Sequence, residues 1–164
     1  MKKIYLLRHA KAEKNAICDD FDRKITQEGK EDLKRLALRL KNYDIRLDSI
    51  ISSSSKRTKM TVKRFAKAVG FDSENIIYKD ELYLASTNEI FTILQALSDD
   101  ITEVAVVGHN PGICELIEFL SPLCVENFAT SAFLCLEFDI VSFNELSKDS
   151  GRVVFFENVR ELKA

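Results

Sequence analysis

Two short apolar runs in this sequence each lead into a histidine, and the chain has only these two histidines. Arg8-His9 follows the run 4–7, and His109 stands two residues after the run 104–107. Short runs of this kind are typical of buried strands, and ligands of an open α/β sheet bind outside the carboxyl ends of its strands. We therefore expect both histidines at one ligand-binding edge of a sheet.

A permanently charged residue, Arg57, is expected at the same edge. It opens a helical pattern directly after the apolar pair 50–51 and the serines 52–55. The guanidinium groups of Arg8 and Arg57 are planar clamps for phosphate oxygens. They also disfavour protonation of a nearby imidazole, whose reference pKa is about 6.5, so His9 would be a neutral nucleophile at pH 7. This set of residues suits phosphoryl transfer.

The elements that must position these residues alternate along the chain. Six short apolar runs predict strands, at 4–7, 50–51, 76–78, 104–107, 133–138 and 153–156. Between the first five runs, apolar residues recur at helical spacing in four segments, 33–40, 62–69, 90–97 and 113–120. The alternation predicts an α/β three-layer sandwich, with helices on both faces of a mainly parallel sheet. The last two runs are expected to form a C-terminal antiparallel hairpin at or near an edge.

Two of the predicted helices have start signals of their own. Ser86, with Glu89 three residues later, forms a capping box. Asn110 before Pro111 indicates an N-cap followed by proline at the first helical position.

The composition is that of an ordinary globular protein. The chain has 164 residues, 46% of them hydrophobic and 30% charged, which excludes collagen-like and disordered classes. We expect one domain over residues 1–164, in which the long connections 10–25 and 121–132 are candidates for functional loops. No apolar run approaches the roughly 20 residues of a membrane-spanning helix, and the first run is too short for a signal peptide. We expect a cytoplasmic protein with no membrane partner.

Positive and negative charges are divided unevenly along the chain. The net charge of -2 argues against a nucleic-acid partner. Residues 23–67 nevertheless hold 14 Lys and Arg against 5 Asp and Glu, whereas residues 72–164 hold 5 against 17. One interpretation is that solvated helix faces simply differ in charge. The other is a basic flank beside the active site that attracts a phosphorylated or acidic partner.

The cysteines and histidines do not predict a metal centre. The four cysteines, Cys18, Cys114, Cys124 and Cys135, include no C-x-x-C pair, and neither histidine has a second one at His-x-x-x-His spacing. We expect reduced, mostly buried thiols, no metal and no other cofactor. A two-histidine metal hydrolase is therefore a poor alternative.

Three motifs, in this order along the chain, resemble the histidine phosphatase superfamily. They are Arg8-His9-Ala10, Ser53-x-x-x-Arg57-Thr58-x-x-Thr61 and Gly108-His109-Asn110-Pro111-Gly112. The segment Asp22-Arg23-x-Ile25-Thr26-x-x-Gly29 is similar to the family's segment before its first helix. The short length resembles the small phosphohistidine phosphatase branch of this phosphoglycerate mutase-like family.

The resemblance implies a role for each matched residue. His9 would be transiently phosphorylated, and Arg8, Arg57 and His109 would form the phosphate pocket without a metal. Ser53 and Asn110, which lie in the same motifs, are further candidates for phosphate contacts. The implied fold, an α/β sandwich on a mainly parallel sheet, agrees with the pattern above.

These motifs do not identify a proton donor. Many larger relatives carry an acidic residue in an insertion for which this chain is too short. Glu81 or Asp80 lies about where an acid would enter the site, and Glu81 is our candidate for activating water. The pair Thr130-Ser131 is a candidate for placing a hydroxyl beside the phosphate, with Ser131 as the candidate site residue. The imidazole of phosphohistidine is a better leaving group than an alkyl alcohol and needs less help from an acid. We therefore expect phosphohistidine in a protein as the substrate.

Two alternatives stay open. One is a non-catalytic module that binds phosphate or phosphorylated proteins. The other is a phosphatase of the same fold that acts on small phosphorylated molecules.

Overall fold

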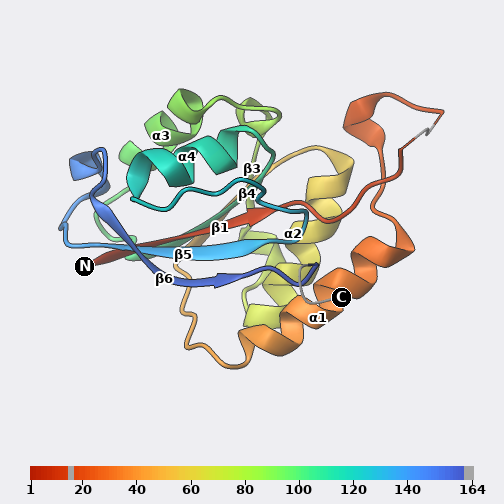
Figure 1. The fold of residues 1–164 in the computed structure, drawn as a ribbon, viewed down its shortest axis with the longest axis horizontal. Coiled ribbons are helices and arrows are strands. Elements are labelled where there is room, and N and C mark those ends of the chain that lie inside the picture. Colours follow the sequence, from red (N-terminus) through yellow and green to blue (C-terminus); the bar gives the residue numbers. More distant parts are fainter. Residues whose placement is uncertain (15–16, 161–164) are drawn as a thin grey trace.

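One mixed sheet of six strands forms the centre of the computed structural model, which describes residues 1–14 and 17–160 (Figure 1). The strands are β1 (Lys2–Arg8), β2 (Ser49–Ser53), β3 (Ile77–Lys79), β4 (Glu103–Gly108), β5 (Phe133–Phe138) and β6 (Gly151–Glu157). Their order across the sheet is β3-β2-β4-β1-β5-β6. The first four strands are parallel, and β5 pairs antiparallel with both β1 and β6. The predicted mainly parallel sheet with a C-terminal hairpin at its edge is confirmed.

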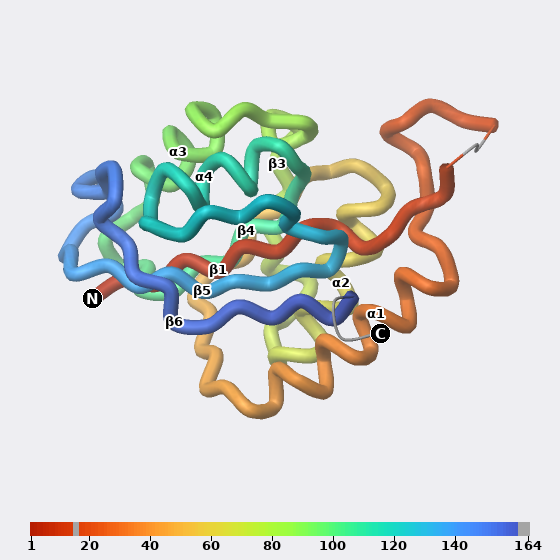
Figure 2. Tube along the Cα trace, viewed as in Figure 1, coloured from red at the N-terminus to blue at the C-terminus, as the bar shows by residue number. Residues whose placement is uncertain are grey.

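Two pairs of helices cover the two faces of the sheet (Figures 1 and 2). They are α1 (Gln27–Leu40), α2 (Lys56–Val69), α3 (Thr87–Gln95) and α4 (Gly112–Leu120). Alternate residues of each strand point to opposite faces, so Ile4 and Leu6 pack with α3 and α4 while Tyr5 and Leu7 pack with α1 and α2. The three layers and the four predicted helices are therefore confirmed. No helix in the described part of the chain is long and apolar enough to cross a membrane.

The two helix starts differ in outcome. The Ser86–Glu89 capping box is present, with both of its reciprocal hydrogen bonds. The N-cap prediction for Asn110 is wrong, because α4 begins at Gly112 and Pro111 holds the cap position without a side-chain bond. The Asn110 side chain instead donates from Nδ2 to the carbonyl oxygen of Phe128 at 2.8 Å. A long-range partner has thus replaced the local cap.

The prediction of mostly buried thiols is also wrong. All four cysteines are free, but only Cys135 is buried; Cys114 is half-buried, and Cys18 and Cys124 are exposed. The exposed pair lies in the long connections 10–25 and 121–132, at positions whose side chains face solvent. Cys135 belongs to β5, where an inward position buries it.

Candidate active site

The neighbouring strands β1 and β4 bring the two histidines to the same edge of the sheet. Arg8 lies opposite Gly108 in the parallel register, and the backbone N–H of His9 donates to the carbonyl of Gly108 at 3.1 Å. The two imidazole rings therefore lie close together, with 5.2 Å between the centroids of His9 and His109. Both side chains are buried, as expected where strand ends meet beneath covering loops.

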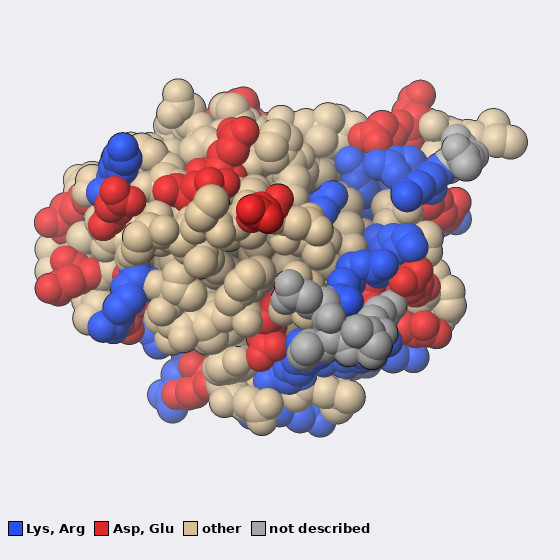
Figure 3. Space-filling model, in the orientation of Figure 1, with Lys and Arg blue, Asp and Glu red and all other residues tan. Residues whose placement is uncertain are grey.

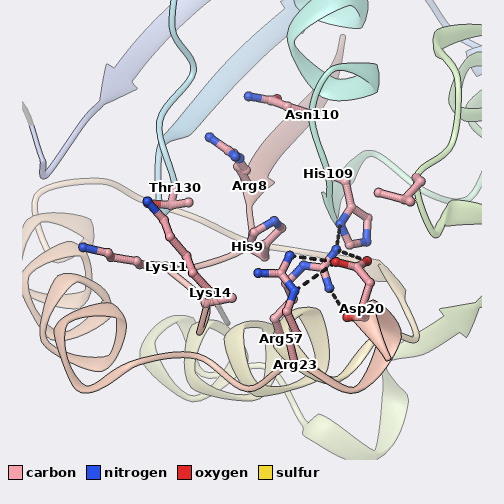
Figure 4. Close-up of a pocket in the computed structure, with 12 residues that line it drawn as sticks. Arg8, His9, Lys11, Lys14, Asp20, Arg23, Arg57, His109, Asn110 and Thr130 are labelled. Atoms are coloured by element: carbon pink, nitrogen blue, oxygen red, sulfur yellow. Dashed lines mark hydrogen bonds and ion pairs between the residues drawn. The ribbon is translucent and has the colours of Figure 1, made fainter. Parts of the chain in front are cut away.

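A cavity of about 380 Å³ opens at this edge (Figure 4). Its lining residues are Arg8, His9, Lys11, Ala12, Lys14, Asp20, Arg23, Arg57, Leu84, His109, Asn110 and Thr130. Five of them are cations and Asp20 is the one carboxylate among them. A concave site with this excess of positive charge is suited to an anion of small-molecule size. Arg8, His9, Arg57, His109 and Asn110 are thus together, as the strand and helix pattern predicts.

Hydrogen bonds determine which nitrogen of His9 carries its proton. Nδ1 lies 2.8 Å from the carbonyl oxygen of Ala10, and a carbonyl only accepts. Nδ1 is therefore the protonated nitrogen, and Nε2 has a lone pair and no hydrogen bond to the described residues. Burial lowers the pKa of His9 to about 3, and the nearby charges of Arg57 and Arg8 act in the same direction. His9 is neutral at pH 7.

Residues 53–58, at the end of β2 and the start of α2, hold His109 in place. Of these residues, only Arg57 lines the cavity. His109 Nε2 lies 2.9 Å from Ser53 Oγ and 3.3 Å from Thr58 Oγ1, and its Nδ1 lies 3.5 Å from a terminal nitrogen of Arg57. Because a guanidinium only donates, the proton of His109 is on Nε2. Burial, followed by the charge of Arg57, lowers the pKa of His109 to about 4. Ser53 is fully buried behind His109, so the structure makes it a support for the ring.

Thr61, the last residue of the second sequence motif, connects the segment after β1, which holds His9, to the start of α2, which holds Arg57. Its hydroxyl accepts from the backbone N–H of Ala10 at 2.9 Å and donates to the carbonyl of Arg57 at 2.8 Å. On the other side, a Cβ on Gly29 would lie only 2.5 Å from the carbonyl oxygen of Lys11. Glycine at this position therefore lets α1 pack closely against the segment after His9.

The two arginines of the site keep unused donors. Arg8 donates from Nη1 to the carbonyl of Phe128 at 3.2 Å, and burial, together with the charge of Arg57, lowers its pKa. The Nε atoms of Arg8 and Arg57 are buried and have no hydrogen-bond partner among the described residues. Buried donors without partners are costly, and an anion in the cavity is a natural acceptor for guanidinium N–H groups.

Asp20 was not singled out from the sequence, yet it is central to the geometry. It lies in a short 3-10 turn (Asp20–Asp22) within the connection 10–25. Arg57 donates to the Asp20 carbonyl at 2.7 Å and to its carboxylate at 3.0 Å, and the Tyr83 hydroxyl donates to the same carboxylate. The Tyr83 bond, followed by Arg57, lowers the pKa of Asp20 to about 2. The only sequence signal for Asp20 is the length of its loop.

Besides Ser53, two more candidates from the sequence lie outside the cavity lining. Glu81 is exposed and lines a separate hollow with Asn88 and Thr92, because the 3-10 turn Asp80–Leu82 points Leu82 into the core. The structure therefore does not bring Glu81 to the phosphate pocket.

Ser131 is likewise outside the cavity lining. It is fully buried with its hydroxyl unpaired, and its backbone N–H donates to the Arg8 carbonyl at 3.1 Å. Thr130, the other member of the predicted pair, does line the cavity. The sequence reasoning also missed three lining cations, Lys11, Lys14 and Arg23, because loop residues lack periodicity.

The described residues include no group of three or more His, Cys, Asp or Glu side chains that could hold a metal ion. Fold and site together define a class: an α/β sandwich with a cationic pocket at the strand ends, built around two buried neutral histidines. Phosphate-handling enzymes are a class of this description.

Comparison with known proteins finds one family model that matches part of the chain. Residues 4–83 match the model of the histidine phosphatase superfamily (branch 1). The matched segment holds Arg8, His9 and Arg57 of the cavity and makes the chain similar to this superfamily. No curated protein matches the chain.

Solved structures are similar over nearly the whole chain. A protein assigned as the phosphohistidine phosphatase SixA of Agrobacterium tumefaciens is 28% identical, with a TM-score of 0.79, covering 96% of this chain and 97% of that one. The protein histidine phosphatase SixA complexed with tungstate has a TM-score of 0.82 at 22% identity, covering 98% and 99%. A protein assigned as SixA of Nakamurella multipartitia has a TM-score of 0.80 at 24% identity, covering 96% and 95%.

Proposed function

We propose that this protein is a phosphatase that removes the phosphoryl group from phosphohistidine in a protein, through a phosphorylated His9 intermediate. The similarity to structures described as phosphohistidine phosphatases supports the substrate class. The geometry around His9 supports the intermediate, because Nε2 carries the lone pair and is bordered by Arg8 and Arg57.

The first chemical step transfers the phosphoryl group to His9. A bond forms between His9 Nε2 and phosphorus as the bond from phosphorus to the substrate nitrogen breaks, and its electron pair stays on that nitrogen. His9 gains positive charge, which strengthens the hydrogen bond from Nδ1–H to the Ala10 carbonyl. Arg8 and Arg57 stabilise the phosphoryl oxygens.

The second step returns the enzyme to its starting state. The oxygen of a water molecule bonds to phosphorus, and the electron pair of the breaking bond returns to His9 Nε2. Both protons of the water leave with inorganic phosphate, so charge and atoms balance. His109 becomes a phosphate donor when its cavity-side nitrogen gains a proton, which the charge of a bound phosphate favours.

One observation carries the choice of substrate. Asp20 is the single carboxyl group among the described residues that line the cavity, and Tyr83 and Arg57 keep it ionised. An ionised carboxylate cannot protonate a leaving group. A phosphorylated imidazole protonated on its other nitrogen leaves as a neutral molecule, whereas an alkyl alcohol needs an acid.

Two peptides of one sequence, carrying phosphohistidine or phosphoserine at the same position, test this choice. We expect kcat/KM to be at least about 100-fold higher for the phosphohistidine peptide, the usual scale of a missing general acid. Equal values would contradict the proposal and favour a phosphomonoesterase. Tight phosphate binding without turnover of either peptide would contradict it in favour of a binding module.

A further inference from the structure

A second concave surface lies on the outer side of α1 and α2, away from the site. This α1–α2 groove has a volume of about 440 Å³. Its lining residues are Lys30, Leu33, Lys34, Ala37, Lys41, Arg64, Lys67 and Ala68. Both helices start beside the cavity, α1 against Lys11 and α2 at Arg57, so the groove follows them outward from the active site.

The charge of the groove is of one sign. Five of its eight lining residues are cations, and none is an Asp or Glu. None of its four lysines forms an ion pair within the described chain, and Arg64 donates only to the Met60 carbonyl. Lys30 and Lys34 are one helical turn apart, a like-charge spacing that destabilises a helix. The fold therefore holds these cations close together without a counter-charge of its own.

The floor of the groove is apolar. Leu33, Ala37 and Ala68 form it, together with the aliphatic stems of the surrounding cations. Lys30 and Lys41 are eleven residues apart on α1, so the groove is about 16 Å long, which matches about three turns of a helix. An apolar strip bordered by cations is complementary to a helix with an apolar stripe flanked by carboxylates.

We propose that the α1–α2 groove docks an acidic amphipathic helix of a partner protein. The proposal goes beyond the proposed function and does not depend on it, because docking is separate from turnover. All five cations of the groove belong to residues 23–67, the segment in which Lys and Arg outnumber Asp and Glu. Figure 3 shows Asp and Glu prominent over α3 and α4, and Lys and Arg beside Asp and Glu over loop 10–25 and the start of α1.

Other anionic partners fit this surface less well. A membrane is flat and takes up protruding apolar side chains, whereas Leu33, the one large apolar residue of the groove, is buried. A nucleic-acid backbone presents phosphates and sugars, for which an apolar floor offers no contact. A helix with both carboxylates and apolar side chains uses the rim and the floor together.

The test uses the full chain and a fluorescent 14-residue peptide with leucines at helical spacing and glutamates elsewhere. Anisotropy titrations compare the normal protein with Lys34→Glu/Lys67→Glu and with the matched control Lys63→Glu/Lys148→Glu, whose lysines are exposed outside the groove. We expect the groove variant to bind at least tenfold more weakly and the control to bind nearly as well as the normal protein. The neutral pair Lys34→Gln/Lys67→Gln should fall between them.

Hydrolysis of a small phosphoramidate serves as the folding control and should be unchanged in all variants. Equal peptide binding by the groove variant and the control would overturn the proposal. So would absence of peptide binding combined with Lys34- and Lys67-dependent binding of phosphatidylserine vesicles or of a DNA duplex.

Discussion

His9 and His109 are held in opposite tautomers by their neighbours. The Ala10 carbonyl fixes the proton of His9 on Nδ1, whereas Ser53 and Arg57 together place that of His109 on Nε2. Each ring therefore turns an unprotonated nitrogen toward the phosphate pocket. For His9 this is the state of a nucleophile, and for His109 it is a state that must gain a proton before it donates to phosphate.

The two histidines should not titrate near neutral pH in the free protein. Their pKa values are lowered to about 3 and about 4, chiefly by burial, so both stay neutral as pH falls from 8 to 5. The chain has two histidines only, and imidazole carbon–proton NMR signals followed over this range check the expectation directly. A midpoint near 6.5 for His9 would contradict it.

Because Asp20 pairs with Arg57, we expect it to compete with substrate phosphate for that guanidinium. Asp20→Asn removes the negative charge, so we expect the inhibition constant of inorganic phosphate to fall by roughly three- to tenfold, a modest change because the carboxylate is half exposed. Product-inhibition kinetics measure it. Asp22→Asn, in the same turn but without an ion pair to the described residues, is the matched control and should have no effect. An unchanged or higher constant in Asp20→Asn would contradict this role.

At the scale of elements, the site depends on how α2 is attached to the end of β1. The Thr61 hydroxyl makes that attachment through Ala10 and Arg57. The helix thereby fixes His9, the proposed nucleophile, and Arg57, a proposed phosphate ligand, relative to each other, although they are 48 residues apart in the sequence.

Thr61→Val should weaken both stability and catalysis. It leaves the buried N–H of Ala10 without its acceptor, which we expect to lower the free energy of unfolding by about 1–3 kcal/mol and to reduce kcat more than it raises KM. Urea unfolding and steady-state kinetics measure the two effects. Thr61→Ser keeps the hydroxyl and should restore most of both. A Thr61→Val protein with normal kcat would rule out the positioning role.

Across the whole molecule, those features of the fold and site that depend on hydrophobic periodicity and strand direction could be predicted from the sequence. The four-residue set Arg8, His9, Arg57 and His109 converges because parallel strands end at one edge and α2 starts beside them. Asp20 and Lys11 could not be predicted, because irregular loops reach the cavity through long-range contacts. The prediction that Glu81 enters the site was wrong for a related reason. The single 3-10 turn Asp80–Leu82 turns Leu82, and not Glu81, toward the interior.

The buried histidines also make the folded state sensitive to acid. An unfolded histidine takes up a proton near pH 6.5, whereas folded His9 does not until about pH 3, so stability is lost as pH falls below 6.5. From pH 7.5 to pH 5 we expect His9 to account for about 2 kcal/mol of the decrease. Urea unfolding at both values, for the normal protein and His9→Asn, measures this share. Equal decreases in the two proteins would contradict it.

Rapid-quench labelling tests the central claim, that His9 carries the phosphoryl group, most directly. A labelled phosphoramidate is mixed with the normal protein or with His9→Ala, and each sample is quenched within one turnover. We expect an acid-labile, alkali-stable phosphoenzyme in the normal protein and none in His9→Ala, which should keep its fold. A labelled or catalytically active His9→Ala protein would show that another residue is the nucleophile.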